Sequence, residues 1–354
     1  MAQISASVQK IFRAVPNMGL SSVKNNDVRQ FLEFTTATTI ERALTEFAAR
    51  ICYNSVKRMG SAPNFIEKLL SSGHLSTAEH ASLMLPVNSL GGGFSKIKVF
   101  EVNRYFDFPK GYVAGNLRSW LELMGRGEYN PLFEYIVAVF PDVFPSSPYV
   151  NEVELYEFAS QAAINVPAFE GDFSKPNVYL LAVNRGELDV SRRPNTRLQN
   201  PWARYTWLVE GVSRSLTHQL VRHRGLSFSQ ESQRYVDFTN GSKQRDYLNF
   251  IVPESWTVEQ QAKLYDAYVN IAEFYEEMRS DGAKKEDARF VLPNGASTRL
   301  VVSGNHNELL HFFKVRCAKD AQWEIRRLAL QMLKQAFLAT PTAELTALYE
   351  DFWE

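Results

Sequence analysis

Residues 222–235, RHRGLSFSQESQRY, form the densest group of side chains in the chain that could do chemistry. Three arginines, one histidine and three serines fall within this stretch, together with two aromatic residues. Arginine presents a rigid donor fork that suits phosphates and planar acceptors. Serine and glutamine add short, directional hydrogen-bonding groups. The stretch therefore predicts one wall of a site for a phosphorylated, aromatic ligand.

The overall composition is that of an ordinary globular protein. Of its 354 residues, 45% are hydrophobic and 22% are charged. Lys and Arg number 39, as do Asp and Glu. Because no global basic field results, the sequence predicts no nucleic-acid partner.

The cysteines and the hydropathy pattern bear on the compartment. Cys52 and Cys317 are too few for a disulfide framework and lack metal-site spacing, which favours a reducing compartment, the cytoplasm. The N-terminus has no long apolar region, and no run of about 18 apolar residues occurs. We therefore expect neither a signal peptide nor a membrane span.

Helical spacing organises the N-terminal part. Apolar residues recur at helical intervals over 39–55, and NFIEKLLS at 64–71 predicts a second helix. Residues 1–38 are expected to form an irregular arm with one short strand or helix.

The polar turn GHLSTAEH at 73–80 has two readings of equal weight. Ser76 or Thr77 could cap a short helix, with Glu79 completing a capping box, or the turn could belong to a site. Zinc binding is disfavoured because His74 and His80 are six residues apart, with no further ligand cluster nearby.

Residues 88–204 differ from the rest of the chain in composition, because they hold nine of the fifteen prolines. We expect a hinge at Gly91–Gly93, helices over 131–140 and 152–163, a strand over 178–183 and a solvated basic loop over 191–197. The segment is interpreted as a small lobe or an insertion of unknown role. The chain is accordingly divided into an N-terminal part (1–87), the insertion (88–204) and a C-terminal part (205–354).

The C-terminal part supports the polar stretch. Apolar residues from Tyr205 to Val221 predict a buried helix that runs directly into Arg222. Further helices are predicted over 256–281, 285–292, 305–317 and 321–337, with a strand over 298–303 and an amphipathic helix at the end. For the 256–281 helix, one apolar face is expected, formed by Leu264, Tyr268, Ile271, Phe274, Tyr275 and Met278. Arg316 lies among apolar residues and therefore needs a partner or a ligand.

A short internal similarity links two distant segments. VAGNLR at 113–118 is similar to VSGNHN at 302–307. Six residues can match by chance, so the similarity alone does not establish a duplication.

The polar stretch also carries a family resemblance. Arg-His-Arg is followed by seven residues and Ser232, and continues into Gln-Arg-Tyr, which closely resembles the signature of flavin-dependent thymidylate synthases. Other blocks follow in the family's order: FAARICY at 47–53, the Gly-His to Glu-His turn at 73–80, EGVSR at 210–214 with His218-Gln219, ARFVLP at 288–293, Gly304-Asn305, His311-Phe312 with Arg316, and AQWEIR at 321–326. The resemblance covers residues 40–87 and 205–337, leaving 88–204 outside it.

This resemblance implies an α+β fold, a mixed sheet with packed helices, here carrying a large insertion. It implies synthesis of dTMP from dUMP, with methylenetetrahydrofolate as the one-carbon donor, reduced FAD as the hydride donor and NADPH as the reductant. A homotetramer with active sites at subunit junctions is also implied.

By resemblance, residues can be assigned to two sites, and no metal ligands are expected. The dUMP site would be formed by Gln219, Leu220, Val221, Arg222, Gln230, Glu231, Ser232, Gln233, Arg234, Arg289 and Arg316. FAD would be contacted by Ser76, Arg222, His223, Arg224, Gln230, Asn305, His306, Asn307 and His311.

Arg316 would be the catalytic residue. A uracil ring must hold negative charge on N3 and its carbonyls before its C5 attacks a carbon electrophile, and a fixed guanidinium stabilises that charge without losing a proton.

Two positions depart from the family's pattern. Family members often carry Arg at the position of Asn307, and we hypothesise that Arg118 replaces it. Gln230 stands where some relatives carry Glu, and little loss is expected because both side chains accept hydrogen bonds.

Two other classes of protein were weighed. A cysteine-dependent pyrimidine methylase needs a thiolate nucleophile, and Cys317 lies beside Arg316, which could lower its pKa. Against this, Cys317 and Cys52 lie in apolar helical stretches typical of core residues, and Ser232 has no dedicated base nearby. An RNA- or nucleotide-binding module lacks the basic footprint that such binding needs.

Overall fold

The computed structural model describes residues 25–35, 37–61, 64–86, 106–107, 112–125, 160–161, 176–185, 203–239 and 249–353. Two antiparallel sheets organise these residues. The larger sheet has the order β4-β5-β6-β8-β7, formed by Ser160–Gln161, Asn177–Arg185, Ala203–Ser213, Ser297–Asn305 and Ser227–Gln230. The smaller sheet has the order β1-β3-β2, formed by Ser82–Pro86, Tyr112–Asn116 and Phe106–Asp107. The combination of sheets and helices is as predicted, but all strand pairs among the described residues are antiparallel, so the predicted mixed sheet is not found there.

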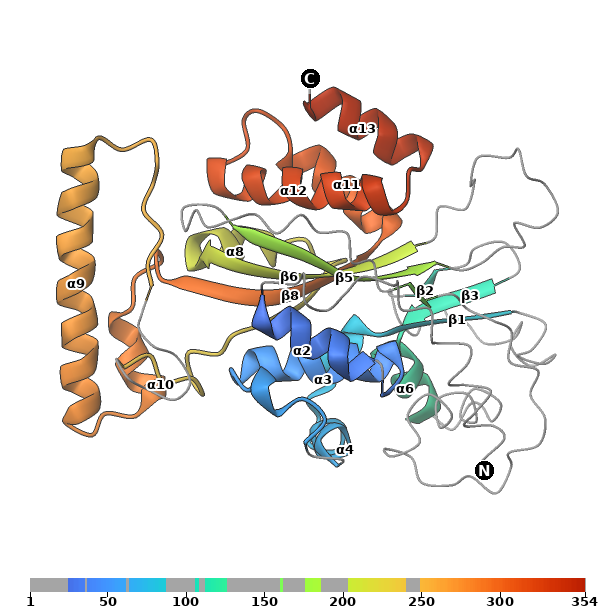
Figure 1. Ribbon diagram of the computed structural model, residues 1–354, viewed down its shortest axis with the longest axis horizontal. Coiled ribbons are helices and arrows are strands. Elements are labelled where there is room, and N and C mark those ends of the chain that lie inside the picture. The colour runs from blue at the N-terminus through green and yellow to red at the C-terminus, as the bar shows by residue number, and fades with distance from the viewer. Residues whose placement is uncertain are drawn as a thin grey trace.

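Helices cover both faces of the larger sheet (Figure 1). On one face lie α8 (Arg214–Leu220), α11 (His306–Arg316), α12 (Trp323–Ala339) and α13 (Ala343–Trp353). Their apolar side chains pack on Trp207, Leu300 and Val302 of the sheet. On the opposite face, α2 (Asn26–Thr35) and α3 (Ile40–Cys52) pack on Leu208 and Val301. Alternate residues of one strand therefore support two separate cores, as the pleat requires.

The remaining N-terminal elements extend from α3. The turn η2 (Val56–Arg58) and α4 (Phe65–Ser71) follow it, and η3 (Leu75–His80) leads into β1. The predicted helices over 39–55 and 64–71 are confirmed as α3 and α4, with Thr39 capping α3 by accepting a hydrogen bond from the Arg42 amide.

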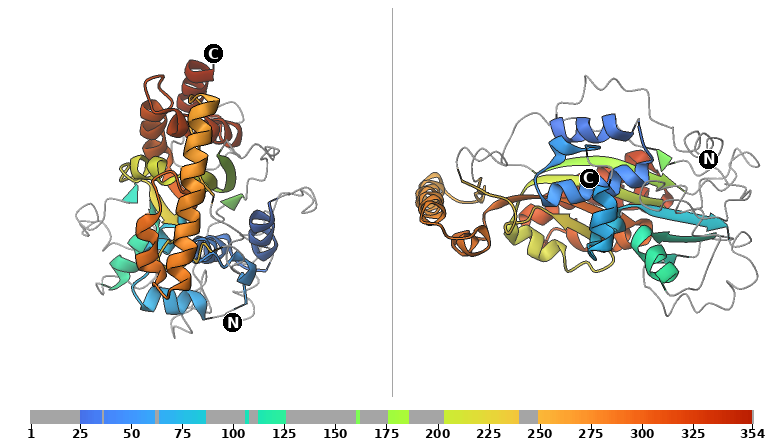
Figure 2. Two further views of the ribbon diagram at one scale, coloured as in Figure 1. Left: turned by 90° about the vertical axis from the view of Figure 1, so that its left-hand side faces the viewer. Right: turned by 90° about the horizontal axis from the view of Figure 1, so that it is seen from below.

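Helix α9 (Val258–Ser280) lies at one side of the molecule, beside α10 (Lys285–Ala288) and η7 (Arg289–Val291), as Figures 1 and 2 show. A capping box formed by Thr257 and Gln260 begins it. Of the apolar face predicted for this helix, only Tyr268 and Tyr275 are buried, and Phe274 is 45% exposed. The six residues span too wide an arc to face one partner, because α9 packs through a single narrow side.

The buried helix predicted over 205–221 is wrong in its first half. Residues 203–213 form strand β6, and only 214–220 are helical. Because β6 lies between α3 and the α11–α12 layer, it is apolar on both faces and lacks the alternation of a half-exposed strand. A register shift at Gly211, which has a φ of 69°, ends the regular pairing before Ser213 caps α8.

The capping interpretation of the 73–80 turn is also wrong. Residues 75–80 form the 3-10 turn η3, whose N-cap residue, His74, makes no side-chain capping bond. The Thr77 hydroxyl donates to the His74 carbonyl at 3.2 Å, and Glu79 pairs with Arg118 instead of closing a box. The side chains of Glu79 and His80 thus bond to groups outside the turn.

The described parts of 88–204 belong to the two sheets. They supply β2, β3, β4 and β5, and α6 (Leu117–Gly125) packs on η3. The strand predicted over 178–183 is confirmed as β5. Of the predicted helices 131–140 and 152–163, only 160–161 are described, and these form β4. Gly91–Gly93 and the 191–197 loop lie outside the described residues, and the division of the chain at 87 and 204 stays a prediction.

The similarity between 113–118 and 302–307 extends to local structure. Each segment is a strand that ends at Asn and continues into a helix, β3 into α6 and β8 into α11. The Asn116 side chain accepts from the Ser119 amide at 2.9 Å, and Asn305 accepts from the Glu308 amide at 2.9 Å. Each Asn also pairs across its sheet, with Ser82 and Arg204 respectively. The two segments therefore form the same type of supersecondary unit, a strand followed by a helix whose start is capped by Asn.

Candidate functional site

The polar stretch begins where α8 ends, and it leads into the edge strand β7. Ser213 caps α8, and the buried carboxylate of Glu324 accepts from the Ser213 amide at 2.7 Å and from its hydroxyl at 2.6 Å. Burial raises the pKa of Glu324. This contact joins α12 to the start of α8, so the loop after α8 is held by the core rather than by its own polar residues.

His223 and Arg316 meet at the end of this loop. The Arg316 Nε–H donates to His223 Nε2 at 2.9 Å, across 93 residues of sequence. His311 lies beside them, with its ring centroid 6.1 Å from that of His223, and Phe312 supports the His223 ring edge-on at 5.1 Å. Burial, Arg316 and His311 lower the pKa of His223 to about 4. The predicted partner for Arg316 is thus a neutral imidazole.

Gln230 is the last residue of β7, and Glu231 follows it directly. The Gln230 amide donates to the hydroxyls of Thr217 and Thr298, on the face covered by α8. Glu231 turns to the other face, where its carboxylate bonds Arg299 at 3.2 Å and is 2% exposed. Its assignment to dUMP stays a prediction, although the carboxylate already has a buried cationic partner.

Ser232, Arg234 and Arg289 lie away from the His223–Arg316 pair. The Ser232 amide donates to the carbonyl of Cys52, at the end of α3. Arg234 pairs with Glu286 at 2.9 Å, and Arg289 donates to the Glu286 carbonyl at 3.0 Å. Figure 1 places α10, which carries Glu286, on the side of the sheet where α3 lies.

The residues assigned to dUMP therefore form two groups within one chain. Gln230, His223 and Arg316 lie on the α8–α11 face, whereas Ser232 and Arg234 lie beside the end of α3. The other predicted members are exposed or intermediate at the loop, except for the buried Leu220. The assigned side chains thus lie at two positions on either side of the edge strand β7.

The residues assigned to FAD offer suitable hydrogen-bonding groups. Arg222, Arg224, Asn307 and His311 are exposed around the loop and the start of α11, and Ser76 is exposed on η3. His306 is 1% exposed, and its Nε2 atom has no hydrogen-bond partner among the described residues. A helix N-terminus, exposed guanidinium groups and an unpartnered buried ring nitrogen fit a phosphate-bearing cofactor with polar ring edges.

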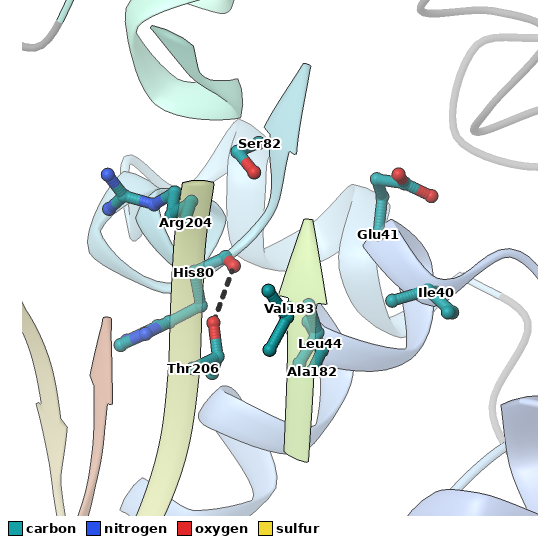
Figure 3. A pocket seen from close by; sticks show the side chains of 9 residues that line it. All are labelled: Ile40, Glu41, Leu44, His80, Ser82, Ala182, Val183, Arg204 and Thr206. Atoms are coloured by element: carbon teal, nitrogen blue, oxygen red, sulfur yellow. Dashed lines mark hydrogen bonds between the residues drawn. The ribbon is translucent and has the colours of Figure 1, made fainter. Parts of the chain in front are cut away.

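Sequence reasoning missed a buried polar network centred on His80. Its Nδ1 lies 2.8 Å from the Ser303 hydroxyl, and its Nε2 lies 2.9 Å from the Ser229 hydroxyl. Thr206 donates to the His80 carbonyl at 3.4 Å, as Figure 3 shows beside a small pocket between α3, β5 and β6. The network ties η3 to β6, β7 and β8. The alternating serines of β7, Ser227 and Ser229, were the sequence signal for it.

Arg204 is a second missed residue. It is 5% exposed and donates to the Glu79 carbonyl at 2.9 Å and to the Ser227 hydroxyl at 3.0 Å. Arg299 is a third, since it joins Asp27, Glu210 and Glu231 under the sheet. Each is the only arginine in a largely buried strand, where the sequence pattern predicted a core element and no polar contact.

Neither cysteine has the environment of a nucleophile. Burial raises the pKa of Cys317 to about 12 and that of Cys52 to about 11. Arg326, rather than Arg316, is the cation that acts on Cys317. Both thiols are therefore protonated near neutral pH, which counts against a cysteine-dependent mechanism.

Arg118 pairs with Glu79 and with Glu122, each at 2.7 Å. Its replacement of the charge missing at Asn307 stays a prediction. In that case Arg118→Ala weakens FAD binding by about tenfold, which corresponds to ~1.4 kcal/mol. Titration of the apoprotein with FAD, followed by flavin fluorescence, measures this, with Glu122→Ala as the matched control. An unchanged affinity for FAD in Arg118→Ala would exclude the role.

No group of three or more His, Cys, Asp or Glu side chains in the described residues is arranged to hold a metal ion. In the same part of the chain, no helix has the length and apolarity needed to cross a membrane.

The fold and the site together define a mixed α/β protein whose arginine-rich loop and capped helix could bind an anionic, planar ligand. Residues 202–342 match the family model described as thymidylate synthase complementing protein. Over these residues the chain is similar to flavin-dependent thymidylate synthases.

Individual relatives carry that family name. A flavin-dependent thymidylate synthase of Geobacter sulfurreducens is 44% identical over 142 residues, covering 40% of this chain and 59% of the relative. Those of Pyrococcus furiosus and Nitratidesulfovibrio vulgaris are 39% and 45% identical, and each match covers 54% of the relative. The chain thus spans about half the length of the curated relatives it matches, and the family match begins at residue 202.

Proposed function

We propose that this chain is a flavin-dependent thymidylate synthase that converts dUMP to dTMP. The observation that carries the proposal is the His223–Arg316 pair, which sets a fixed guanidinium beside the arginine-rich loop within the segment that matches the family. Methylenetetrahydrofolate is the proposed one-carbon donor and NADPH the proposed reductant.

Each group of residues has a proposed task. Arg316 stabilises negative charge on the pyrimidine, because a guanidinium remains protonated and its direction is set by His223. Ser232, Arg234 and Arg289 suit a nucleotide phosphate, since they supply hydroxyl and guanidinium donors. Gln230 is oriented by Thr217 and Thr298 and suits a ring amide or a hydroxyl of the ligand.

The proposed cofactor is FAD, held by the exposed arginines of the loop and by the start of α11. Asn305 is fixed as the N-cap of α11, whose backbone N–H groups favour anions, and the unpartnered His306 ring nitrogen lies next to it. Once bound and reduced, FAD would supply the hydride that the reaction needs. The chain's own residues orient both ligands and polarise the pyrimidine.

A second copy of the chain completes the proposed site. The His223–Arg316 pair lies on the α8–α11 face and Ser232 lies beside the end of α3, an arrangement that suits a dUMP site shared between protomers. This supports a homo-oligomer, for which we propose the homotetramer. A cytoplasmic location and an insertion over 88–204 remain part of the proposal.

The test combines colour and turnover. The purified chain should show an oxidised-flavin absorption spectrum, or acquire one on addition of FAD, and should form dTMP from dUMP only when methylenetetrahydrofolate and NADPH are present. Omission of each component in turn provides the control. A colourless protein that gains no flavin and forms no dTMP contradicts the proposal and favours a binding module.

A further inference from the structure

We infer that His223 is a positioning residue that fixes the guanidinium plane of Arg316 through its Nε2 atom. The inference deepens the proposed function and rests on it for the catalytic consequence. The contact itself is a property of the fold and can be measured without turnover. His223 had been expected only to contact FAD, by resemblance.

The first argument is the direction of the hydrogen bond. The Arg316 Nε–H can only donate, so His223 Nε2 must accept at 2.9 Å and its ring proton must be on Nδ1. No described residue accepts a hydrogen bond from the terminal Nη groups of Arg316. The guanidinium is therefore held at its inner nitrogen, and its outer edge remains available to a planar acceptor.

The second argument is the rigidity of the imidazole. Phe312 is fully buried in the core, and its ring meets that of His223 at 89° with centroids 5.1 Å apart. The ring centroid of His311 lies 6.1 Å from that of His223. Because Phe312 and Arg316 belong to the same helix, α11, the support for the imidazole and the group that it orients move together.

The third argument is the charge state. Arg316 and His311, both on α11, are the groups whose charges act on the pKa of His223. Glu308, also on α11, packs against Gly225 two residues further along the loop, and its carboxylate accepts from the Asn305 backbone amide. Burial, together with the Arg316 and His311 charges, lowers the pKa of His223 and keeps the imidazole neutral, as the accepting role requires.

Two substitutions separate orientation from other roles. The amide of Gln reaches the position of Nε2 and can accept from Arg316, whereas the shorter Asn reaches only the position of Nδ1. We expect His223→Asn to lower kcat by roughly ten- to a hundredfold, the usual consequence of a misplaced catalytic group. His223→Gln should recover most of that loss, and FAD affinity should change by less than about twofold in both variants.

The matched control is His218→Asn. His218 is exposed on α8, one turn before the loop, and lies outside the proposed site. Its replacement should leave turnover unchanged. In an Arg316→Ala background, His223→Asn should cause no further loss, because coupled residues are not additive.

An activity-independent measurement completes the test. In the full-length holoprotein, ¹⁵N NMR of the imidazole should show a protonated Nδ1 and an accepting Nε2 at His223, and Arg316→Ala should alter that pattern. A protonated Nε2, or equal loss of FAD affinity in the Gln and Asn variants, overturns the inference and leaves His223 as a flavin contact. If the tautomer is as expected but no variant, wild type included, forms dTMP, the proposed function fails while the positioning contact stands.

Discussion

Replacement of Arg316 by Ala should lower dTMP formation by roughly a hundred- to a thousandfold, the usual effect of removing one preorganised charge-stabilising group. Arg316 is the last residue of α11, and its Nε–H is held by His223 at 2.9 Å. Arg316→Lys retains the charge but loses the planar donor fork and the Nε–H contact, so it should recover little activity.

Steady-state kinetics with dUMP as the varied substrate measure this, and flavin absorbance of each variant shows whether FAD remains bound. Lys314→Ala is the control, because Lys314 is an exposed cation on the same helix, two residues earlier. Turnover within about threefold of wild type in Arg316→Ala, with the flavin retained, would remove Arg316 from the chemistry and with it the basis of the proposed mechanism.

Replacement of His80 by Ala should destabilise the fold by about 3 kcal/mol, because it opens a cavity and removes one hydrogen bond from each of two buried hydroxyls. The ring is 1% exposed and joins Ser303 to Ser229, while its backbone carbonyl accepts from Thr206. Urea unfolding of the wild type and the variant measures the difference. His74→Ala, an exposed histidine at the start of the same turn, should have little effect.

The His80 contribution should also depend on pH. Burial and the nearby Arg204 lower the pKa of His80 to about 3, whereas in the unfolded chain it returns to its ordinary value near 6.5. Between these values the unfolded chain binds a proton that the folded chain does not, so His80 lowers the free energy of unfolding by up to ~1.4 kcal/mol per pH unit on acidification. The stability gap between wild type and His80→Ala should therefore be full above about pH 6.5 and should close within roughly two to three pH units of acidification, because ~1.4 kcal/mol is lost per unit. A gap that does not change with pH contradicts the assignment.

The sequence determined the local features. The stretch 222–235, the capped helix beginning after Asn305 and the position of Arg316 on that helix all follow from short-range patterns, and the structure contains these elements where they were expected. The helices α3, α4, α11 and α12 and the strands β5 and β8 were predicted to within a few residues for the same reason. One-sided burial leaves a periodic trace in the helices, whereas β5 and β8 were identified as short apolar runs bounded by polar or turn-forming residues.

The tertiary structure decided what those features contact. Strand β6 was mistaken for helix because burial on both faces removes the alternation that identifies a strand. The partner of Arg316 lies 93 residues away, and the partners of His80 lie 149 and 223 residues away, so no spacing rule could find them. The pairing of β6 with β8, and of β8 with β7, brings these groups together.

The sequence by itself thus determined which side chains could do chemistry. Residue type decides whether a group can donate or accept a hydrogen bond and whether it can carry a charge. Only the sheet decided that Gln230 would turn to Thr217 and Thr298 on one face while its neighbour Glu231 turns to Arg299 on the other. The physical reason is the pleat. Neighbouring residues of a strand face opposite layers, so side chains that are close in sequence are directed into different environments.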